Sequence, residues 1–386
     1  MKIVMKKRVL FVVLAVLAGI VLFEAVRVEP GVTAAGDRKI SDHFNGEVFF
    51  NPAAPGEVPP LQGAEQRRGF SRWVWRWIFS DDWPRWPEMA AVPAGPPPAT
   101  RVSRGDVVVT PVGHATFLIQ MDGLNILTDP IWSERCSPVS WAGPRRYQPP
   151  GIRFEDLPAV DVVLVSHNHY DHLDLPTLRR LAGKGVPRAV TSLGNRERIR
   201  ETGIPAVEEI DWWDMVRLSP EVTVTMVPAR HFSSRTLWDR NRTLWGGFVV
   251  SGPSGNVYFA GDTGYGPHFH EIARRFGPIR MALLPIAPFN PQASKETSRV
   301  RFASVHMGPD EAVQAHLDLG SRVSIAAHFR VFQLGWDGFD EAPNGVAAAL
   351  KERDLAPASF IVPVFGRAVS VPGETKQAAA RTREAS

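Results

Sequence analysis

Cysteine and uninterrupted runs of one charge are scarce in this sequence. Cys136 is the only cysteine among 386 residues, so an intrachain disulfide is impossible and a thiolate zinc site is excluded. The net charge at pH 7 is only +4, and no block of lysine and arginine suggests a nucleic-acid-binding arm. We therefore expect no nucleic-acid partner, and any metal must be held by histidine and carboxylate side chains.

Two further absences narrow the class of protein. The sequence has no internal repeat at a fixed period, and no motif marks a serine or cysteine nucleophile.

Hydrophobic residues make up 44% and charged residues 22% of the chain, which is typical of a globular protein. The length allows one large domain or two ordinary ones.

A proline-rich segment at residues 93–99 marks the main domain boundary. We expect an irregular extension over residues 29–100, a folded domain over 101–372 and a disordered polar tail over 373–386. The extension is rich in proline, glycine and alanine and has little periodicity.

The N-terminus carries a targeting pattern. Lys6, Lys7 and Arg8 precede an apolar run from Val9 to Phe23. A basic patch before such a run is typical of a membrane anchor or an export signal. We favour an uncleaved anchor within residues 1–28, because no clear cleavage site of small residues follows it; a cleaved signal is the alternative. In either case the positive-inside rule places the rest of the chain outside the cytoplasm, in the periplasm or beyond.

Arginine and tryptophan alternate over residues 67–86. At helical spacing the aromatic residues form one face and the arginines another. Such a segment suits a membrane interface. Packing of the tryptophans on the folded domain is the alternative.

Strand-like apolar runs recur after residue 100. They lie at 107–110, 115–120, 125–130, 161–166, 189–191, 222–227, 247–250, 257–260, 282–284, 323–327 and 360–364. Helical patterns interleave at 174–182, 268–276, 309–319 and 342–353. Many short strands with fewer helices predict a mixed α/β fold of two sheets flanked by helices.

The densest chemical signal is His167-Asn168-His169-Tyr170-Asp171-His172, directly after the apolar run 161–166. In an extended segment His167 and His169 point the same way, so both can bind one metal. Asp171 and His172 follow a change of direction and should reach a second position beside the first. A solvated histidine-rich turn is the alternative. The motif predicts two neighbouring metals and supplies two ligands to each, so the remaining ligands must come from distant segments.

Three distant residues share the context of this motif. His231, Asp262 and His328 each follow the end of a predicted strand. Singly, each could be an ordinary satisfied polar residue. Together they complete the ligands for two sites if Asp262 bridges the metals.

Several motifs between residue 101 and about residue 340 match one family. They are Gly113–Ile119, Leu127–Pro130, Gly143–Arg146, His167–His172, Pro228–His231, Asp239–Gly247, Phe259–Gly264 and His306–Val313. On these motifs the chain resembles the metallo-β-lactamase fold superfamily. Within it, the chain is similar to the N-acyl-phosphatidylethanolamine-hydrolysing phospholipase D branch and its bacterial relatives.

The resemblance implies a four-layer αββα sandwich over residues 101–372 with a dinuclear zinc site. The implied ligands are His167, His169 and His231 for the first zinc, Asp171, His172 and His328 for the second, and Asp262 as the bridge. Iron or manganese is also compatible with such a site. Asp129 fits either the orientation of a ligand imidazole or a structural strand-end cap.

The implied activity is hydrolysis by metal-activated hydroxide, with a phospholipid phosphodiester as substrate and a membrane surface as partner. Asp262, Asp171 and His306 are the candidate catalytic residues. His306 could contact substrate or donate a proton, or it could simply precede a helix. The alternatives are a zinc lactonase or other small-molecule hydrolase, and, less favoured, a non-catalytic membrane-anchored binding protein. The chain departs from the branch at Phe329-Arg330 and at a polar stretch over 292–301, where pocket walls are expected.

Overall fold

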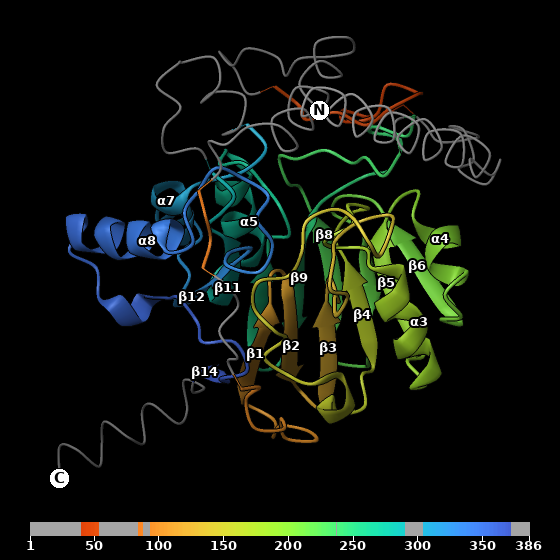
Figure 1. Cartoon of the computed structure of the whole chain (residues 1–386), viewed down its shortest axis with the longest axis horizontal. Helices are drawn as coiled ribbons and strands as arrows, with labels where there is room; N and C mark the ends of the chain where they lie inside the picture. Colours follow the sequence, from red (N-terminus) through yellow and green to blue (C-terminus); the bar gives the residue numbers. More distant parts are fainter. Residues whose placement is uncertain (1–39, 54–83, 88–92, 237, 290–303, 372–386) are drawn as a thin grey trace, which may run out of the picture.

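The computed structural model describes residues 40–53, 84–87, 93–236, 238–289 and 304–371. Two seven-stranded sheets lie face to face, in the orders β14-β1-β2-β3-β4-β5-β6 and β13-β12-β11-β10-β9-β8-β7 (Figure 1). The first sheet is built from β1 (Val107–Gly113), β2 (Thr116–Met121), β3 (Leu124–Thr128), β4 (Val162–Val165), β5 (Arg188–Ser192), β6 (Ala206–Ile210) and β14 (Val369–Val371). The second is built from β7 (Met215–Arg217), β8 (Thr223–Val227), β9 (Gly247–Gly252), β10 (Gly255–Phe259), β11 (Ile279–Pro285), β12 (Val323–Ala327) and β13 (Phe360–Ile361).

Each sheet has an antiparallel part and a parallel part. Strands β1 to β3 pair antiparallel and β3 to β6 pair parallel. In the second sheet β7 to β10 pair antiparallel and β10 to β13 pair parallel. As a result β1, β3 and β4 run in one direction, and so do β8, β10 and β12. Residues that follow these strands therefore meet at one edge of each sheet.

Helices cover the outer faces of both sheets (Figure 1). α3 (Leu175–Gly183) and α4 (Arg196–Arg200) lie on the first sheet, and α5 (His268–Phe276), α7 (Pro309–Asp318) and α8 (Glu341–Glu352) lie on the second. Two short 3-10 turns, η1 (Phe154–Asp156) and η2 (Pro357–Ser359), complete the elements.

Successive side chains along a strand point to opposite faces of its sheet and so pack into different layers. Phe117 and Ile119 of β2 point into the core between the sheets, whereas Leu118 joins the cluster under α3. In β10, Phe259 points into the same central core and Tyr258 joins the cluster under α5, α7 and α8. Each sheet thus buries both faces, which requires one helical layer outside each sheet. The predicted αββα sandwich is confirmed.

The N-terminal arm, which we define as residues 40–53, lies on this sandwich. Phe44 and Phe49 belong to the central core between the sheets. His43 stacks on Trp212 with 4.2 Å between ring centroids, and its Nε2 lies 2.8 Å from Asp211. Residues 40–53 of the expected irregular extension form no helix or strand, and they pack on the folded domain through Phe44, Phe49 and His43.

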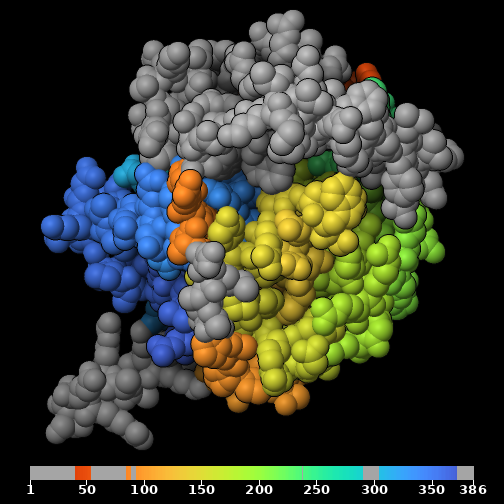
Figure 2. Space-filling view, viewed as in Figure 1, coloured from red at the N-terminus to blue at the C-terminus, as the bar shows by residue number. Residues whose placement is uncertain are grey.

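The end of the arginine and tryptophan segment is also described. Trp86 is buried, donates from Nε1 to the carbonyl of Asp337 at 2.9 Å and packs edge-on against Tyr147 and Phe339. Figure 2 shows this region in orange at the junction of the yellow and blue surfaces. Trp86 packs on the folded domain, as the alternative to a membrane-interface segment predicts. Residues 67–83 lie outside the described part of the chain.

The predicted membrane-anchored location must be corrected. In the described part of the chain no helix is long and apolar enough to cross a membrane. The longest, α8, has 12 residues, whereas a span needs about 20. Residues 1–28, on which the prediction of an anchor or signal was based, and the predicted tail at 373–386 lie outside the described residues.

Candidate metal centre

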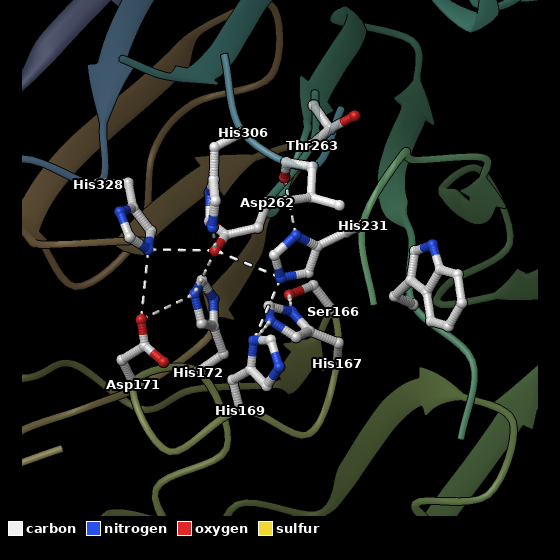
Figure 3. Close-up of polar contacts among 12 residues, drawn as sticks. Ser166, His167, His169, Asp171, His172, His231, Asp262, Thr263, His306 and His328 are labelled. Atoms are coloured by element: carbon white, nitrogen blue, oxygen red, sulfur yellow. Dashed lines mark hydrogen bonds and ion pairs between the residues drawn. The ribbon is translucent and has the colours of Figure 1, made fainter. Parts of the chain in front are cut away.

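The site lies where strands of both sheets end. His114 follows β1, Asp129 follows β3 and the motif 167–172 follows β4. His231, Asp262 and His328 follow β8, β10 and β12 in the facing sheet. Because these strands run in the same direction within each sheet, their carboxyl ends bring these side chains to one edge of the sandwich. Figure 3 shows the motif residues together with His231, Asp262 and His328.

The first cluster contains His167, His169 and His231. His167 Nε2 lies 2.8 Å from His169 Nδ1, and His231 Nε2 lies 3.2 Å from the same atom. Candidate ligand atoms of the three residues all lie within 4.8 Å of one another. The two histidines of the motif therefore share one position, as their spacing predicts, and His231 joins them from the second sheet.

The second cluster gathers around Asp171. Its Oδ2 atom lies 3.2 Å from His328 Nε2 and 3.3 Å from His172 Nε2. His114 Nε2 is closer still, at 2.8 Å. These four residues form the largest candidate metal group in the described part of the chain.

Asp262 lies between the two clusters (Figure 3). Its Oδ2 atom is 3.2 Å from His328 Nε2 and 3.3 Å from His172 Nε2, both in the second cluster. The same oxygen is 3.7 Å from His231 Nε2 of the first cluster. One carboxylate oxygen thus faces both positions, which is the geometry expected of a bridging ligand.

Hydrogen bonds to the other ring nitrogens orient these imidazoles. Asp129 Oδ2 lies 2.7 Å from His172 Nδ1, and the carbonyl of Val305 lies 2.8 Å from His231 Nδ1. Asp129 also accepts from the backbone N–H and the hydroxyl of Ser166. Asp129 therefore both orients an imidazole and caps the end of a strand. In His172 and in His231, the hydrogen bond to Nδ1 leaves Nε2 turned towards the centre.

His306 stands at the rim of the same group. Its Nδ1 lies 3.9 Å from Asp262 Oδ2, and its ring centroid is 4.9 Å from that of His231. The side chain is 13% exposed, against 2% for Asp262. The structure thus places His306 beside the site and ahead of α7.

The histidine pKa values differ between the two clusters. Burial lowers the pKa of His169 and His231 to about 3, so both imidazoles are neutral and can offer a lone pair at pH 7. Burial would also lower the pKa of His328, but Asp262 and Asp171 outweigh it and raise that pKa to about 9. The second cluster is therefore a negative pocket that favours a positive charge.

The donor set fits metal ions. Within the described residues, the buried atoms His172 Nε2 and Asp262 Oδ1 have no hydrogen-bond partner. Such atoms cost free energy unless something else satisfies them. Neutral imidazole and carboxylate oxygen, without any thiolate, suit zinc and also iron or manganese.

Two residues that contact the candidate ligands, His114 and Asn51, are not among the site residues predicted from the sequence. His114 was matched only as part of a family motif; its position after a strand is the signal that could have found it. Asn51, in the N-terminal arm, donates from Nδ2 to the carbonyl of His231 and accepts from its N–H. No sequence pattern points to Asn51.

Comparisons with known proteins identify the family of this chain. The model of the Beta-lactamase superfamily domain matches residues 124–329. An uncharacterized protein of Mycobacterium tuberculosis is 39% identical over 294 residues, covering 74% of this chain and 75% of that protein. N-acyl-phosphatidylethanolamine-hydrolyzing phospholipase D 1 of Caenorhabditis elegans is 34% identical over 276 residues, covering 68% of this chain and 76% of that one.

A solved structure shares the fold. Igni18, a metallo hydrolase from Ignicoccus hospitalis, aligns with a TM-score of 0.51 at 22% identity, over 70% of this chain and 100% of that one. Fold, site and relatives together define a metal-dependent hydrolase. The chain belongs to the metallo-β-lactamase superfamily.

Proposed function

We propose that this protein is a dinuclear zinc phosphodiesterase that cleaves phospholipids. The observation that carries the two-metal centre is the position of Asp262 Oδ2, within 3.7 Å of nitrogens from both clusters. The substrate class rests on the relative in Caenorhabditis elegans, whose name gives hydrolysis of N-acyl-phosphatidylethanolamine. The hydrolase domain is proposed to span residues 101–372.

Each side chain has a proposed place. The first metal is assigned to His167, His169 and His231, the second to Asp171, His172 and His328, and the bridge to Asp262. When bound, the metals would lower the pKa of a water molecule and offset negative charge on a phosphate oxygen.

The protein's own groups orient the reaction. Asp129 and the carbonyl of Val305 hold the imidazoles of His172 and His231 so that Nε2 faces the centre. In the net reaction water adds to phosphorus, the bond from phosphorus to the head-group oxygen breaks, and that oxygen takes up a proton. His306, at the more exposed rim, is proposed to contact the substrate phosphate or to deliver this proton.

A product assay tests the proposal. Zinc-loaded protein is incubated with vesicles of N-acylated phosphatidylethanolamine, vesicles of phosphatidylcholine, and acyl lactones, and products are identified by mass spectrometry. Phosphatidic acid together with the released head-group alcohol is the expected result. Asp262→Asn should abolish it. Asp318→Asn should not, because Asp318 is a carboxylate of α7 that accepts from Tyr265 and is outside the proposed ligand set.

Two outcomes would contradict the proposal. Turnover of lactones without turnover of either lipid would assign the protein to small-molecule hydrolysis on the same fold. A purified protein with less than one metal per chain and no turnover would support a binding role instead. Metal analysis of the protein as purified also distinguishes zinc from iron and manganese.

A further inference from the structure

His114 is a buried histidine outside the proposed ligand set. It lies in the turn between β1 and β2, with a positive φ of 58° and a relative exposure of 1%. A histidine in this backbone region is uncommon, and such residues gather where the surrounding structure requires them. The ring packs edge-on against Phe332, with 5.2 Å between centroids.

The side chain of His114 contacts one residue of the second cluster. Its Nε2 lies 2.8 Å from Asp171 Oδ2, the oxygen that also faces His172 and His328. An ionised carboxylate only accepts hydrogen bonds, so His114 Nε2 carries the proton and donates it. His114 thus donates to the same oxygen of Asp171 that faces the centre.

The backbone of His114 contacts another residue of that cluster. Its carbonyl accepts a hydrogen bond from the N–H of His328 at 2.9 Å, and the two rings lie 3.9 Å apart between centroids. His328 also has a positive φ, of 62°. The turn after β1 and the turn after β12 are thus joined through His114, and one residue holds both Asp171 and His328.

The distances around Asp171 Oδ2 fit two proposed ligands and one hydrogen-bond donor. Two ligands about 2.0 Å from a tetrahedral ion lie roughly 3.3 Å apart. His172 and His328 keep 3.3 and 3.2 Å from Asp171 Oδ2, which matches that spacing. His114, at 2.8 Å, has the separation of a charge-assisted hydrogen bond. Because His167 Nε2 and His169 Nδ1 of the first cluster are also 2.8 Å apart, the substitutions described below, and not this distance, separate a donor from a ligand.

We propose that His114 is a positioning residue for the second metal, which it serves by donating to Asp171 and by anchoring His328. This inference rests on the two-metal centre of the proposed function but not on its substrate. It predicts that the N–H of His114, rather than its lone pair, is what the centre requires.

The test compares two substitutions in the full-length protein. His114→Gln places an amide N–H near the position of Nε2, and His114→Ala removes the donor. We titrate each metal-free protein with zinc in competition with a chromophoric chelator, and with cobalt to record the absorption spectrum of each site. His316→Ala is the matched control, because His316 is also buried but bonds to Ser324 away from the site.

The expected result is selective. His114→Ala should weaken binding of the second metal equivalent by about 10- to 100-fold and change its cobalt spectrum. The first equivalent should bind as in wild type, which also shows that the variant is folded. His114→Gln should recover most of the lost affinity, and His316→Ala should leave both equivalents unchanged.

Two results would overturn the inference. Binding of both equivalents by His114→Ala with wild-type affinity and spectrum would show that the contact is idle. Equal loss in His114→Gln and His114→Ala would show that the ring nitrogen acts as a ligand and not as a donor. A wild-type protein that binds two metals but cleaves no phospholipid would contradict the proposed function alone.

Discussion

Asn51 and His231 are joined by two hydrogen bonds although they lie 180 residues apart in the chain. Asn51 Nδ2 donates to the carbonyl of His231 at 2.8 Å, and Asn51 Oδ1 accepts from its N–H at 3.2 Å. Trp245 donates to the same oxygen at 3.1 Å. The amide side chain pairs with the backbone of His231 as a neighbouring strand would, so the N-terminal arm supports the backbone at the first histidine cluster.

Replacing Asn51 should loosen that cluster. In Asn51→Leu the side chain keeps a similar size but leaves the buried N–H and carbonyl of His231 without their partner. Such a loss costs about 1–3 kcal/mol of unfolding free energy. We also expect zinc affinity at the first site to fall by roughly 10-fold or more. Denaturant unfolding and zinc titration measure the two effects.

Asn45→Ala is the control for this substitution, because Asn45 lies in the same arm but is exposed and serves only a local turn. It should leave zinc affinity unchanged. Equal zinc affinity in Asn51→Leu and wild type would contradict a supporting role for the arm.

The docking of the arm should depend on pH through His43. Burial lowers the pKa of His43, but hydrogen bonds and charges from Asp211 and Asp42 outweigh it, so the pKa is raised above its ordinary 6.5. A histidine with a raised pKa in the folded state stabilises that state fully below pH 6.5. This contribution is lost as the pH rises through the folded-state pKa.

Limited proteolysis of the arm and denaturant unfolding between about pH 6 and about pH 9 test this effect. Wild type should lose stability with rising pH, and His43→Gln, which cannot become charged, should show a flatter profile. Identical profiles for the two proteins would contradict the prediction.

Asp129→Asn separates the two roles of Asp129. The amide oxygen can still accept from the backbone N–H of Ser166, so the strand-end cap is kept. The negative charge beside His172 Nδ1 is lost. If orientation and polarisation of His172 matter, affinity for the second metal should fall by about 10- to 100-fold while the melting temperature changes little. Unchanged metal affinity would leave Asp129 with the cap alone.

Removal of metal should affect stability as well as turnover. The second cluster holds Asp171 and Asp262 at close range, and without cations the charge of this pocket must be balanced by protons on His172 and His328. Chelator-treated protein should therefore unfold at lower temperature and regain stability on addition of zinc. Calorimetry with and without chelator measures the shift, and an unchanged melting temperature would argue against metal in this pocket.

Much of the fold could be predicted because the signals are local. The apolar pattern at 268–276 predicted α5 with its observed bounds, since one face of that helix is buried. β6 and β7 were missed because their residues are half exposed and lack a continuous apolar run. β14, three residues long, is a strand only because β1 offers it an edge.

By itself the sequence determined the chemistry. Its histidines and aspartates after apolar runs predict nitrogen and oxygen ligands, and the spacing of residues 167–172 predicts two adjacent positions, because those relationships depend only on local backbone geometry. Tertiary structure alone decided which distant groups converge. Asp262 between the clusters, His114 on Asp171 and Asn51 on His231 depend on strand direction and on packing between the sheets and the arm. A local pattern carries no information about distances across such contacts.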